Sequence, residues 1–488
     1  MSKWISLLLF LLISLGTQGQ QKYWIYLKDK MSIAGEEKSI EKASIDSVFN
    51  AFITTENIQT VVTSKWLHAT SAVLENSQLE KLEQQPFVKS IAPIDRNIKI
   101  LSTNSPDTYQ IARVLDQIQA DTLIELGLNG EGIKIGIIDA GFLGANEDKY
   151  LKEIISNDQI KGYQNFIERE IVDPYAGPEK NNDTHGTRVW QALAGYDDAS
   201  FIGLAHQSEF YLARTDQSDK EYHGEEDYWV AALEWMHGQG VRLINSSLGY
   251  STGFDNPEDD YKPSQVDGKT SALTQVVDLA TREKGMTIIV SAGNDGNDDF
   301  KIISIPADAK GVIAVGSSGH RYWNKLGYSS IGPEHLNQVK PEVSCFAAGG
   351  TSFAAPVITG LVACLMQAKP DIDNAEIRDI LIKSSHLYPY PNNYLGYGVP
   401  NVKKAIELLE NTELKVNINP VIEASKSYEI VLPKSNNIMA FHKKNNIIVI
   451  EQEKLRWADD KVIVTRLANA LYTTVASEDE VWEIKWKD

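Results

Sequence analysis

The sequence predicts an α/β fold with a mainly parallel sheet and helices on both faces. From about residue 110 to about residue 410, short apolar runs alternate with longer segments whose apolar residues recur at helical spacing. The short runs are apolar on both faces, which is typical of parallel strands covered on both sides. They read IKIGIID, EFYLART, VRLINSSLG, MTIIVSAG and GVIAVGS, and the helical segments between them include EEDYWVAALEWMHGQG and ALTQVVDLATREKG.

Two smaller domains flank this region, which we assign to residues 106–410. Residues 20–105 begin with the order strand, helix, strand, strand, helix, strand, a ferredoxin-like α+β candidate, and end in a polar linker without periodicity. Residues 411–488 contain the strand-like runs YEIVLP, NIIVIEQE, DKVIVTRL and EVWEIKWKD and no helix signal of length. We therefore expect a small β-rich C-terminal domain.

The first residues have the layout of a signal peptide. Lys3 precedes an apolar block from Trp4 to Leu15, and small or polar residues follow around Gly19. The block is short for a membrane helix, and no later stretch of about 18 or more apolar residues follows. We expect residues 1–19 to be removed from an exported protein, secreted or at the cell surface, whose mature chain has no membrane span. An N-terminal anchor is the alternative.

Composition excludes several classes of function. The formal net charge is −19, which gives phosphate backbones no electrostatic attraction, so we expect no nucleic-acid partner. Cys345 and Cys364 are the only cysteines, which excludes a disulfide-dense scaffold. Both stand in apolar surroundings without His, Asp or Glu at metal-ligand spacing. We expect buried free thiols and assign no metal ligands.

Four polar residues stand where strands end or helices begin. Asp139 ends the run IKIGIID, His185 precedes Gly186 at a helix start, Asn294 follows MTIIVSAG, and Ser352 precedes an apolar helix. Each has an ordinary structural alternative, such as a turn former for Asn294 or a helix N-cap for Ser352. In parallel sheets, however, ligands bind outside the carboxyl ends of the strands. The four side chains can therefore converge on one crevice.

Peptide-bond cleavage requires these residue types. A serine hydroxyl becomes a nucleophile when a neutral imidazole accepts its proton, and a carboxylate fixes the tautomer and stabilises the charged ring. Ser352, His185 and Asp139 supply the three groups. The side-chain amide of Asn294 and the backbone N–H of Ser352 would then donate to the oxyanion of the tetrahedral intermediate.

These segments resemble the subtilisin-like serine peptidases (subtilases, peptidase family S8) from about residue 110 to about residue 410. The motifs IIDAGF, THGTRV, NSSLGY, SAGNDG and GTSFAAP occur in the family's order Asp, His, Asn, Ser. The resemblance implies that Asp139, His185 and Ser352 are the triad and that Asn294 is the oxyanion asparagine. It also implies that the segment Ser247, Leu248 and Gly249 pairs with an extended protein or peptide substrate.

The resemblance also bears on maturation, metal binding, substrate selection and the C-terminal domain. Residues 20–105 resemble, more loosely, a propeptide that assists folding and inhibits until it is cleaved, so we expect a zymogen. No cofactor is expected for catalysis. Many relatives bind structural calcium, but no ligand positions match here. The acidic stretch that contains the run Glu258-Asp259-Asp260 is an ordinary solvated loop or a cation site, and this run and the pair Glu225-Glu226 could instead select basic substrates. The C-terminal domain is a structural β-sandwich, a substrate-binding module or a sorting domain for secretion.

Two other functions remain as alternatives. One is a catalytically silent, exported binding protein on the same fold. The other is a sedolisin-like acid peptidase, which uses Glu and Asp in place of Asp and His. His185 in the segment THGT argues against the second, and labelling of Ser352 by a serine-directed probe would separate the first from a peptidase.

Overall fold

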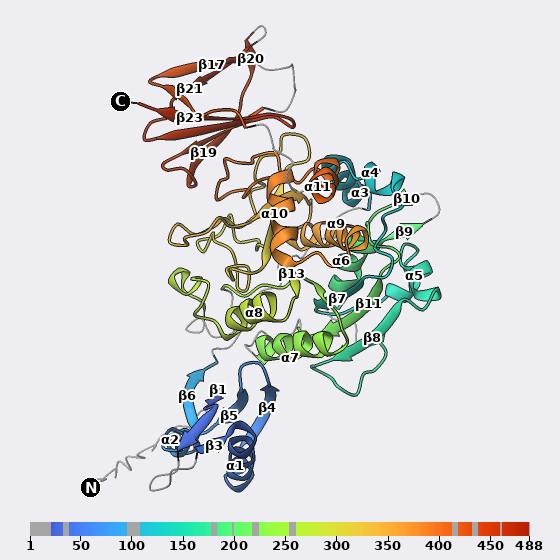
Figure 1. Cartoon of the computed structure of the whole chain (residues 1–488), viewed down its shortest axis with the longest axis vertical. Coiled ribbons are helices and arrows are strands. Elements are labelled where there is room, and N and C mark those ends of the chain that lie inside the picture. The colour runs from blue at the N-terminus through green and yellow to red at the C-terminus, as the bar shows by residue number, and fades with distance from the viewer. Residues whose placement is uncertain are drawn as a thin grey trace, which may run out of the picture. The chain divides into compact units, whose positions relative to one another are not determined.

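The chain is described by a computed structural model (Figure 1). The structure describes residues 21–487 except 33–38, 95–107, 177–182, 198–199, 217–223, 253–259, 412–417, 432–437 and 459–460. The predicted signal peptide, most of the predicted linker, and Glu258 and Asp259 of the acidic run lie outside the described residues. Two compact units make up the chain, Met1–Ile94 and Asp95–Asp488.

The N-terminal unit is a four-stranded antiparallel sheet with two helices. Its elements are β1 (Gln21–Leu27), the hairpin β2 (Lys30–Ser32) and β3 (Ser39–Glu41), α1 (Lys42–Thr55), β4 (Gln59–Ser64), β5 (Ala69–Leu74), α2 (Asn76–Glu83) and β6 (Val88–Pro93). The strand order β4-β5-β1-β6 is the predicted ferredoxin-like arrangement. Ile25, Phe49, Leu82 and Phe87 join the strands and both helices in one core.

The second unit is built on a seven-stranded sheet in which every neighbouring pair is parallel, as predicted. The strands are β7 (Lys134–Asp139), β8 (Ile160–Asn165), β11 (Glu209–Arg214), β12 (Leu243–Ser246), β13 (Thr287–Ser291), β14 (Ile313–Ser318) and β15 (Val343–Phe346), in the order β15-β14-β13-β12-β7-β11-β8. The sequence did not reveal β8 and β15. Both are edge strands, and β8 is polar and half-exposed while β15 has only four residues.

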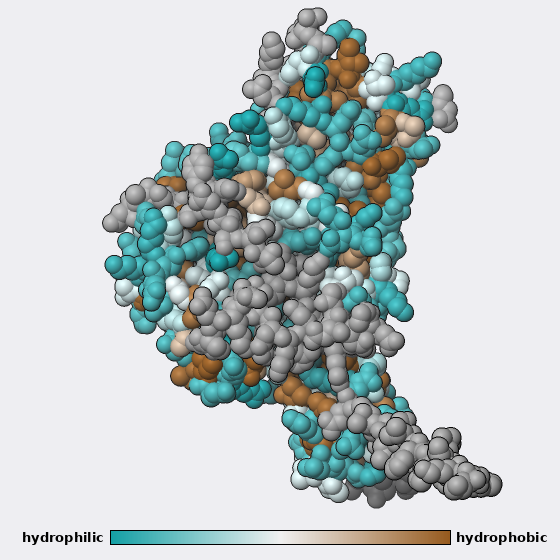
Figure 2. Space-filling model, turned by 180° about the vertical axis from the view of Figure 1, so that it is seen from behind, coloured by the Kyte–Doolittle hydropathy of each residue, from teal (hydrophilic) through white to brown (hydrophobic). Residues whose placement is uncertain are grey.

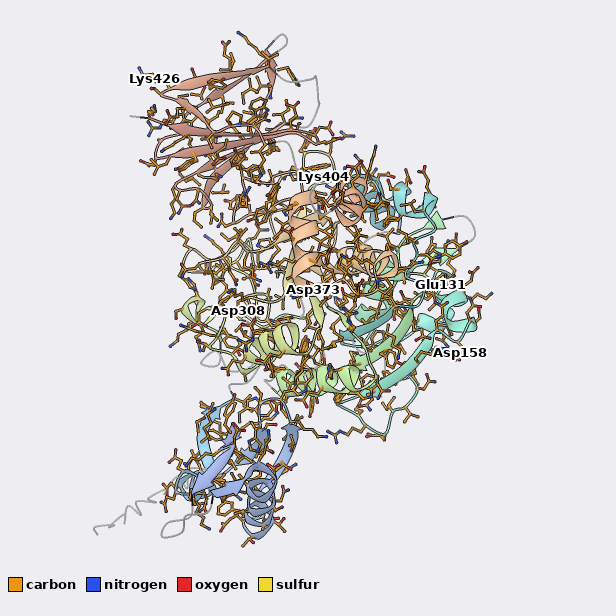
Figure 3. The ribbon with its side chains drawn as sticks, viewed as in Figure 1. Glu131, Asp158, Asp308, Asp373, Lys404 and Lys426 are labelled. Atoms are coloured by element: carbon orange, nitrogen blue, oxygen red, sulfur yellow. The ribbon has the colours of Figure 1, made fainter. Side chains whose placement is uncertain are left out.

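Helices cover both faces of this sheet, α6 and α9 on one side and α7 and α8 on the other (Figure 1). The helices are α3 (Thr108–Ile118), α4 (Asp121–Glu125), α5 (Lys152–Ser156), α6 (His185–Ala194), α7 (Gly224–Gly238), α8 (Ala272–Glu283), α9 (Ala355–Ala368), α10 (Asn374–Ser384) and α11 (Val402–Glu410), and a small hairpin joins β9 (Tyr196–Asp197) to β10 (Ser200–Phe201). Asp373, marked in Figure 3, caps α10 by accepting from the N–H of Glu376 at 2.8 Å.

The strand order places the site. After β7, the chain builds β8 and β11 on one side of β7 and then β12 to β15 on the other. The order therefore reverses between β7 and β12, and the crevice outside the carboxyl ends of strands at such a reversal is where α/β sheets bind ligands. Asp139 ends β7 and Ser247 follows β12 at this point.

The C-terminal domain is a β-sandwich of two sheets. Its strands are β16 (Ile422–Ala424), β17 (Ser427–Val431), β18 (Met439–Lys443), β19 (Val449–Lys454), β20 (Trp457–Ala458), β21 (Lys461–Thr465), β22 (Tyr472–Ala476) and β23 (Val481–Trp486), in sheets β16-β23-β22-β18-β19 and β17-β21-β20. An apolar cluster joins the C-terminal domain to the peptidase region, because Phe441 and Val449 pack with Leu387 and Leu395. Beside this contact, Lys443 and Glu483 form a buried ion pair at 2.9 Å.

The apolar residues and both thiols are mostly inside the protein. The described surface is mostly hydrophilic in the rear view, with scattered apolar patches (Figure 2). Among the described residues, Thr351–Ala368 has the length and hydropathy of a membrane-spanning helix, and 89% of it is buried inside the protein. Cys345 and Cys364 are free and buried, as predicted.

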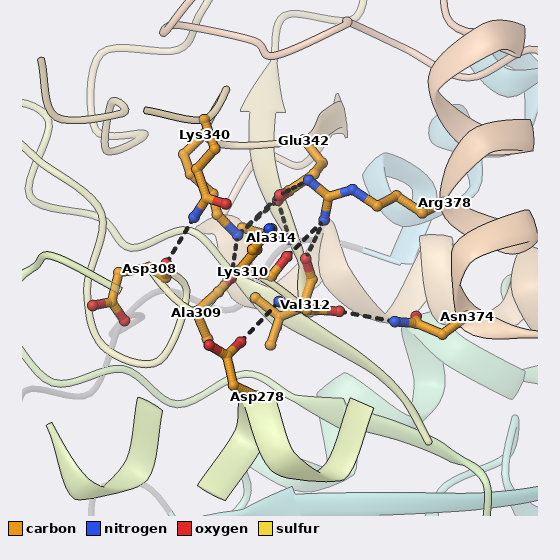
Figure 4. Close-up of polar contacts among 12 residues, drawn as sticks. Asp278, Asp308, Ala309, Lys310, Val312, Ala314, Lys340, Glu342, Asn374 and Arg378 are labelled. Carbon is orange, nitrogen blue, oxygen red and sulfur yellow. Dashed lines mark hydrogen bonds and ion pairs between the residues drawn. The ribbon is translucent and has the colours of Figure 1, made fainter. Parts of the chain in front are cut away.

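A buried network of charges joins α10 to the start of β14 and β15 (Figure 4). Glu342 accepts from Lys340 at 2.9 Å, from Arg378 at 2.6 Å and from the N–H of Ala314 at 2.8 Å. Lys340 also donates to Ala309 O. The side chains of Lys340 and Glu342 are 0% and 1% exposed. Glu342 is thus the anion that compensates two cations inside the protein.

We expect Glu342→Leu to destabilise the protein by about 3–5 kcal/mol, because it leaves Lys340 and Arg378 without their carboxylate. Denaturant unfolding monitored by tryptophan fluorescence measures the loss. Glu334→Leu is the matched control, because its ion pair with Lys444 is exposed and such pairs contribute little. Equal shifts for the two variants would contradict the role given to the network.

Candidate active site

Asp139 and His185 form a buried pair at the carboxyl edge of the sheet. Asp139 is the last residue of β7 and His185 is the first of α6, and His185 Nδ1 lies 2.6 Å from Asp139 Oδ1. Gly186 permits this approach. A Cβ at that position would lie 2.5 Å from Gly141 O and 3.0 Å from Asp139 Cβ. The two residues that the sequence paired are therefore in direct contact.

The surroundings favour the charged imidazole. Burial lowers the pKa of His185, but the attraction and the hydrogen bond of Asp139, with a smaller contribution from Asp216, outweigh burial and raise it above its ordinary value. Because the carboxylate can only accept, Nδ1 carries the proton of the shared bond. His185 Nε2 has no hydrogen-bond partner among the described residues, so it is the nitrogen that can accept a proton.

Ser352 lies in the single turn η4 (Thr351–Phe353) that leads into α9. The helix N-cap alternative is wrong, because Ala354 occupies the N-cap position of α9 and no side-chain capping bond is present. The turn ends before the helix begins, so the Ser352 side chain is available for other contacts. Its Oγ donates to Ser247 O at 3.3 Å, and Ser247 Oγ donates to Ser352 O at 2.8 Å.

The described contacts do not include a hydrogen bond from Ser352 to His185. The ring of His185 lies beside the next residue, Phe353, with the ring centroids 5.9 Å apart. The hydrogen bonds between catalytic groups are often long in a free enzyme and tighten when substrate binds. Ser352 and His185 are thus neighbours whose bond is not formed here.

Asn294 is held with its amide nitrogen free to donate. It follows β13, and its Oδ1 accepts from the N–H of Thr351 at 2.9 Å and from Thr351 Oγ1 at 3.0 Å. The backbone N–H can only donate, so this bond fixes which side-chain atom is oxygen. The Nδ2 group then points away from Thr351, and Asn294 is partly exposed. Such a group can donate to an oxyanion.

The segment Ser247, Leu248 and Gly249 leaves the end of β12 beside Ser352. All three residues are buried. Two hydrogen bonds hold Ser247 in place. Asn245 Nδ2 donates to Ser247 Oγ at 3.3 Å, and Thr359 Oγ1 donates to Asn245 Oδ1 at 2.8 Å. The segment is therefore linked to α9 as well as to the turn that holds Ser352.

Sequence reasoning missed several residues that organise this site. Thr351 positions Asn294, Asn245 and Thr359 support Ser247, and Asp216 acts on His185 through its charge. Asp216 could have been found, since it follows the buried run EFYLART directly, as Asn294 follows its own run. Thr351, Asn245 and Thr359 carry no such signal, because threonine and asparagine are common in any strand or turn.

A calcium site cannot be assigned to the described residues. Among them, no three His, Cys, Asp or Glu side chains are grouped so that they could hold a metal ion. Structural calcium, which many relatives bind, therefore has no ligands assigned in this chain.

Known proteins resemble this chain in sequence. Residues 130–398 match the model of the Subtilase family. The chain is 26% identical over 354 residues to subtilisin NAT of Bacillus subtilis subsp. natto, covering 70% of this chain and 82% of that protein. It is 27% identical over 304 residues to a subtilisin of Bacillus pumilus, covering 60% of this chain and 98% of the relative.

Solved structures share the fold. Fervidolysin from Fervidobacterium pennivorans, a keratinolytic enzyme related to subtilisin, matches with a TM-score of 0.57 and 18% identity over 94% of this chain and 71% of its own. The epidermin leader peptide processing serine protease of Staphylococcus aureus matches with a TM-score of 0.56 and 18% identity over 82% of this chain and 100% of its own. Because the family match spans more than half of the chain, this protein belongs to the subtilase family and is a serine-type endopeptidase.

Proposed function

We propose that this endopeptidase cleaves peptide bonds with Ser352 as nucleophile, His185 as base and then acid, and Asp139 as the carboxylate that orients the imidazole. The single observation that carries the proposal is the buried bond of 2.6 Å between His185 and Asp139, next to the turn that bears Ser352. The substrates are proteins or peptides that lie extended along Ser247, Leu248 and Gly249.

The mechanism follows from which atoms can move a proton. His185 Nε2 takes the proton of Ser352 Oγ as this oxygen bonds to the carbonyl carbon of the substrate. The carbonyl oxygen becomes an oxyanion that accepts from Asn294 Nδ2 and from the backbone N–H of Ser352. His185 then gives its proton to the leaving amine, and the C–N bond breaks. Water hydrolyses the acyl-enzyme by the same proton transfers.

We propose in addition that the protein is exported and made as a zymogen. The layout of residues 1–19 supports export. The ferredoxin-like N-terminal unit has the architecture expected of the propeptide that would inhibit the enzyme until it is cut.

The test of this function is covalent labelling. A fluorophosphonate probe should modify mature protein at Ser352, as located by peptide mass spectrometry. The second-order labelling rate should rise with pH through the pKa of His185, because only the neutral ring can accept the serine proton. Attraction to Asp139 outweighs burial and raises that pKa above its ordinary value of 6.5, so the rise should lie above pH 6.5 and hold at mildly alkaline pH. A labelling rate highest near pH 4, or an adduct on another residue, would refute the assignment.

A further inference from the structure

Asp216 is a buried acid next to the candidate triad, and the proposed mechanism does not use it. It lies two residues beyond Arg214, whose register partner in β7 is Asp139. The N–H of the intervening Thr215 donates to Asp139 O at 3.1 Å. Neighbouring strands lie about 4.8 Å apart. Asp216 therefore lies on the same edge of the sheet as Asp139, one strand farther along.

The carboxylate of Asp216 has little compensation. The residue is 1% exposed, and its Oδ2 has no hydrogen-bond partner among the described residues. Burial, followed by repulsion from Asp139, raises the pKa of Asp216 to about 7, although His185 and Arg214 act in the opposite direction. An ionised carboxylate with an oxygen that lacks a partner is costly to bury. A cation that reached Asp216 would remove this cost.

Arg214, whose charge acts on Asp216, is already engaged. Arg214 Nε donates to Ala140 O at 2.9 Å, and its two terminal nitrogens donate to Glu168 at 2.8 Å and to Asp183 at 3.1 Å. These bonds direct the guanidinium towards other acceptors. Arg214 lowers the pKa of Asp216 through space without a hydrogen bond to it in the described structure.

The acidic character extends towards the substrate segment. Glu225, Glu226 and Asp227 in the first turn of α7 are buried. Tyr250 follows Gly249 directly, and its fully buried hydroxyl has no hydrogen-bond partner among the described residues. Burial, and then the charges of Glu225, Glu226 and Asp216, raise the pKa of Tyr250 well above its ordinary range. Tyr250 thus lies within electrostatic range of Asp216 and of the acidic first turn of α7.

We propose that Asp216 binds the cationic end of a substrate lysine or arginine one or two residues before the scissile bond, with the Tyr250 hydroxyl as a second acceptor. The inference rests on the proposed function. Residues before the scissile bond would lie along Ser247, Leu248 and Gly249, next to Tyr250. An extended peptide advances about 3.3 Å per residue, which is less than the spacing between neighbouring strands. The long side chain of a lysine or arginine close to the scissile bond could therefore reach from the substrate backbone to Asp216.

The test compares matched peptides. Internally quenched substrates carry either lysine or its uncharged isostere norleucine at each of the four positions before the scissile bond, and kcat/KM is measured at pH 8.5 and low salt. Wild-type enzyme should prefer lysine by roughly 10- to 100-fold at one of the two nearer positions, the range expected for a hydrogen bond to a charged group. In Asp216→Asn this ratio should fall towards one. Asp308→Asn is the control, because Asp308 is an equally buried acid bonded to Gly268 and Thr274, and it should keep the wild-type ratio.

The outcomes separate the inference from the proposed function. If wild-type enzyme cleaves both peptides of each pair equally well, the inference is wrong and the peptidase mechanism stands. If it cleaves neither and the probe labels nothing at Ser352, the proposed function fails as well. If Asp216→Asn slows both peptides and leaves their ratio intact, Asp216 acts through His185 and not on the substrate, which also overturns the inference.

The pH dependence of the lysine preference tests the inference in wild-type enzyme alone, so it does not depend on whether a variant folds. The lysine preference should be larger at pH 9 than at pH 6, because the Asp216 carboxyl, whose pKa is about 7, loses its proton between them while lysine stays charged. The other groups that act on Asp216 are Asp139, His185, Arg214 and Asp183. Loss of His185 as a base slows both peptides alike and cancels in the ratio, so the remaining pH dependence of the ratio arises from the charge on Asp216 and its neighbours. A preference that is constant with pH would contradict a carboxylate at this site.

Discussion

Ser352→Ala is expected to lower kcat/KM for a peptide amide by about 10⁶-fold, the size of the loss when a triad enzyme is deprived of its nucleophile. The residual rate would come from the oxyanion donors and from substrate binding, which the substitution leaves in place. Folding should survive, because Ser352 Oγ makes one long hydrogen bond, to Ser247 O at 3.3 Å. Steady-state hydrolysis of a quenched peptide and thermal unfolding together measure the two properties.

Maturation has to be separated from catalysis in this experiment. If the chain cuts itself, the Ser352→Ala precursor should keep the intact mass of residues 20–488 while wild type loses its N-terminal unit. Passing the variant over immobilised wild-type enzyme supplies the cut form, so its activity can be compared with that of mature wild type. Ser384→Ala is a matched control, because Ser384 is also buried and bonds within α10. A cut Ser352→Ala form with more than about 1% of wild-type activity would place the nucleophile elsewhere.

The sheet was predictable because its signal is local. Strands buried on both faces, such as β7 and β13, must be apolar at every position, and their runs stand out in the sequence. The polar residue after each run then marks the carboxyl edge, and this rule led to Asp139 and Asn294. The edge strand β8 and the short β15 were missed, because neither needs a long apolar run.

The supporting contacts of the site were beyond the reach of sequence reasoning. Thr351 and Asn294 lie 57 residues apart in the chain, and Asn245 and Thr359 lie 114 residues apart. These pairs meet only after the sheet and α9 have packed, so no local pattern announces them. The C-terminal strand β18 was missed for a related reason, because its buried residues include His442 and Lys443, whose partners Thr473 and Glu483 lie on other strands.

The hydrogen bond between Asp139 and His185 predicts a second large effect, a loss of kcat in Asp139→Asn. We expect kcat to fall by about 10⁴-fold at neutral pH, because the amide can donate to Nδ1 and so favours the tautomer whose Nε2 carries the proton. That nitrogen then cannot accept the proton of Ser352. The side chain keeps its shape, so KM should change far less than kcat.

The pH dependence of kcat/KM distinguishes this electrostatic role of Asp139 from a merely structural one. In wild-type enzyme Asp139 outweighs burial and raises the pKa of His185. Without the carboxylate charge, burial dominates and lowers that pKa, so the acid limb of kcat/KM should move to lower pH while the plateau falls. Asp308→Asn should alter neither limb nor plateau, since its carboxylate contacts Gly268 and Thr274. A limb that stays in place while the plateau drops would mean that Asp139 only supports the local fold, and His185 would need another source for its raised pKa.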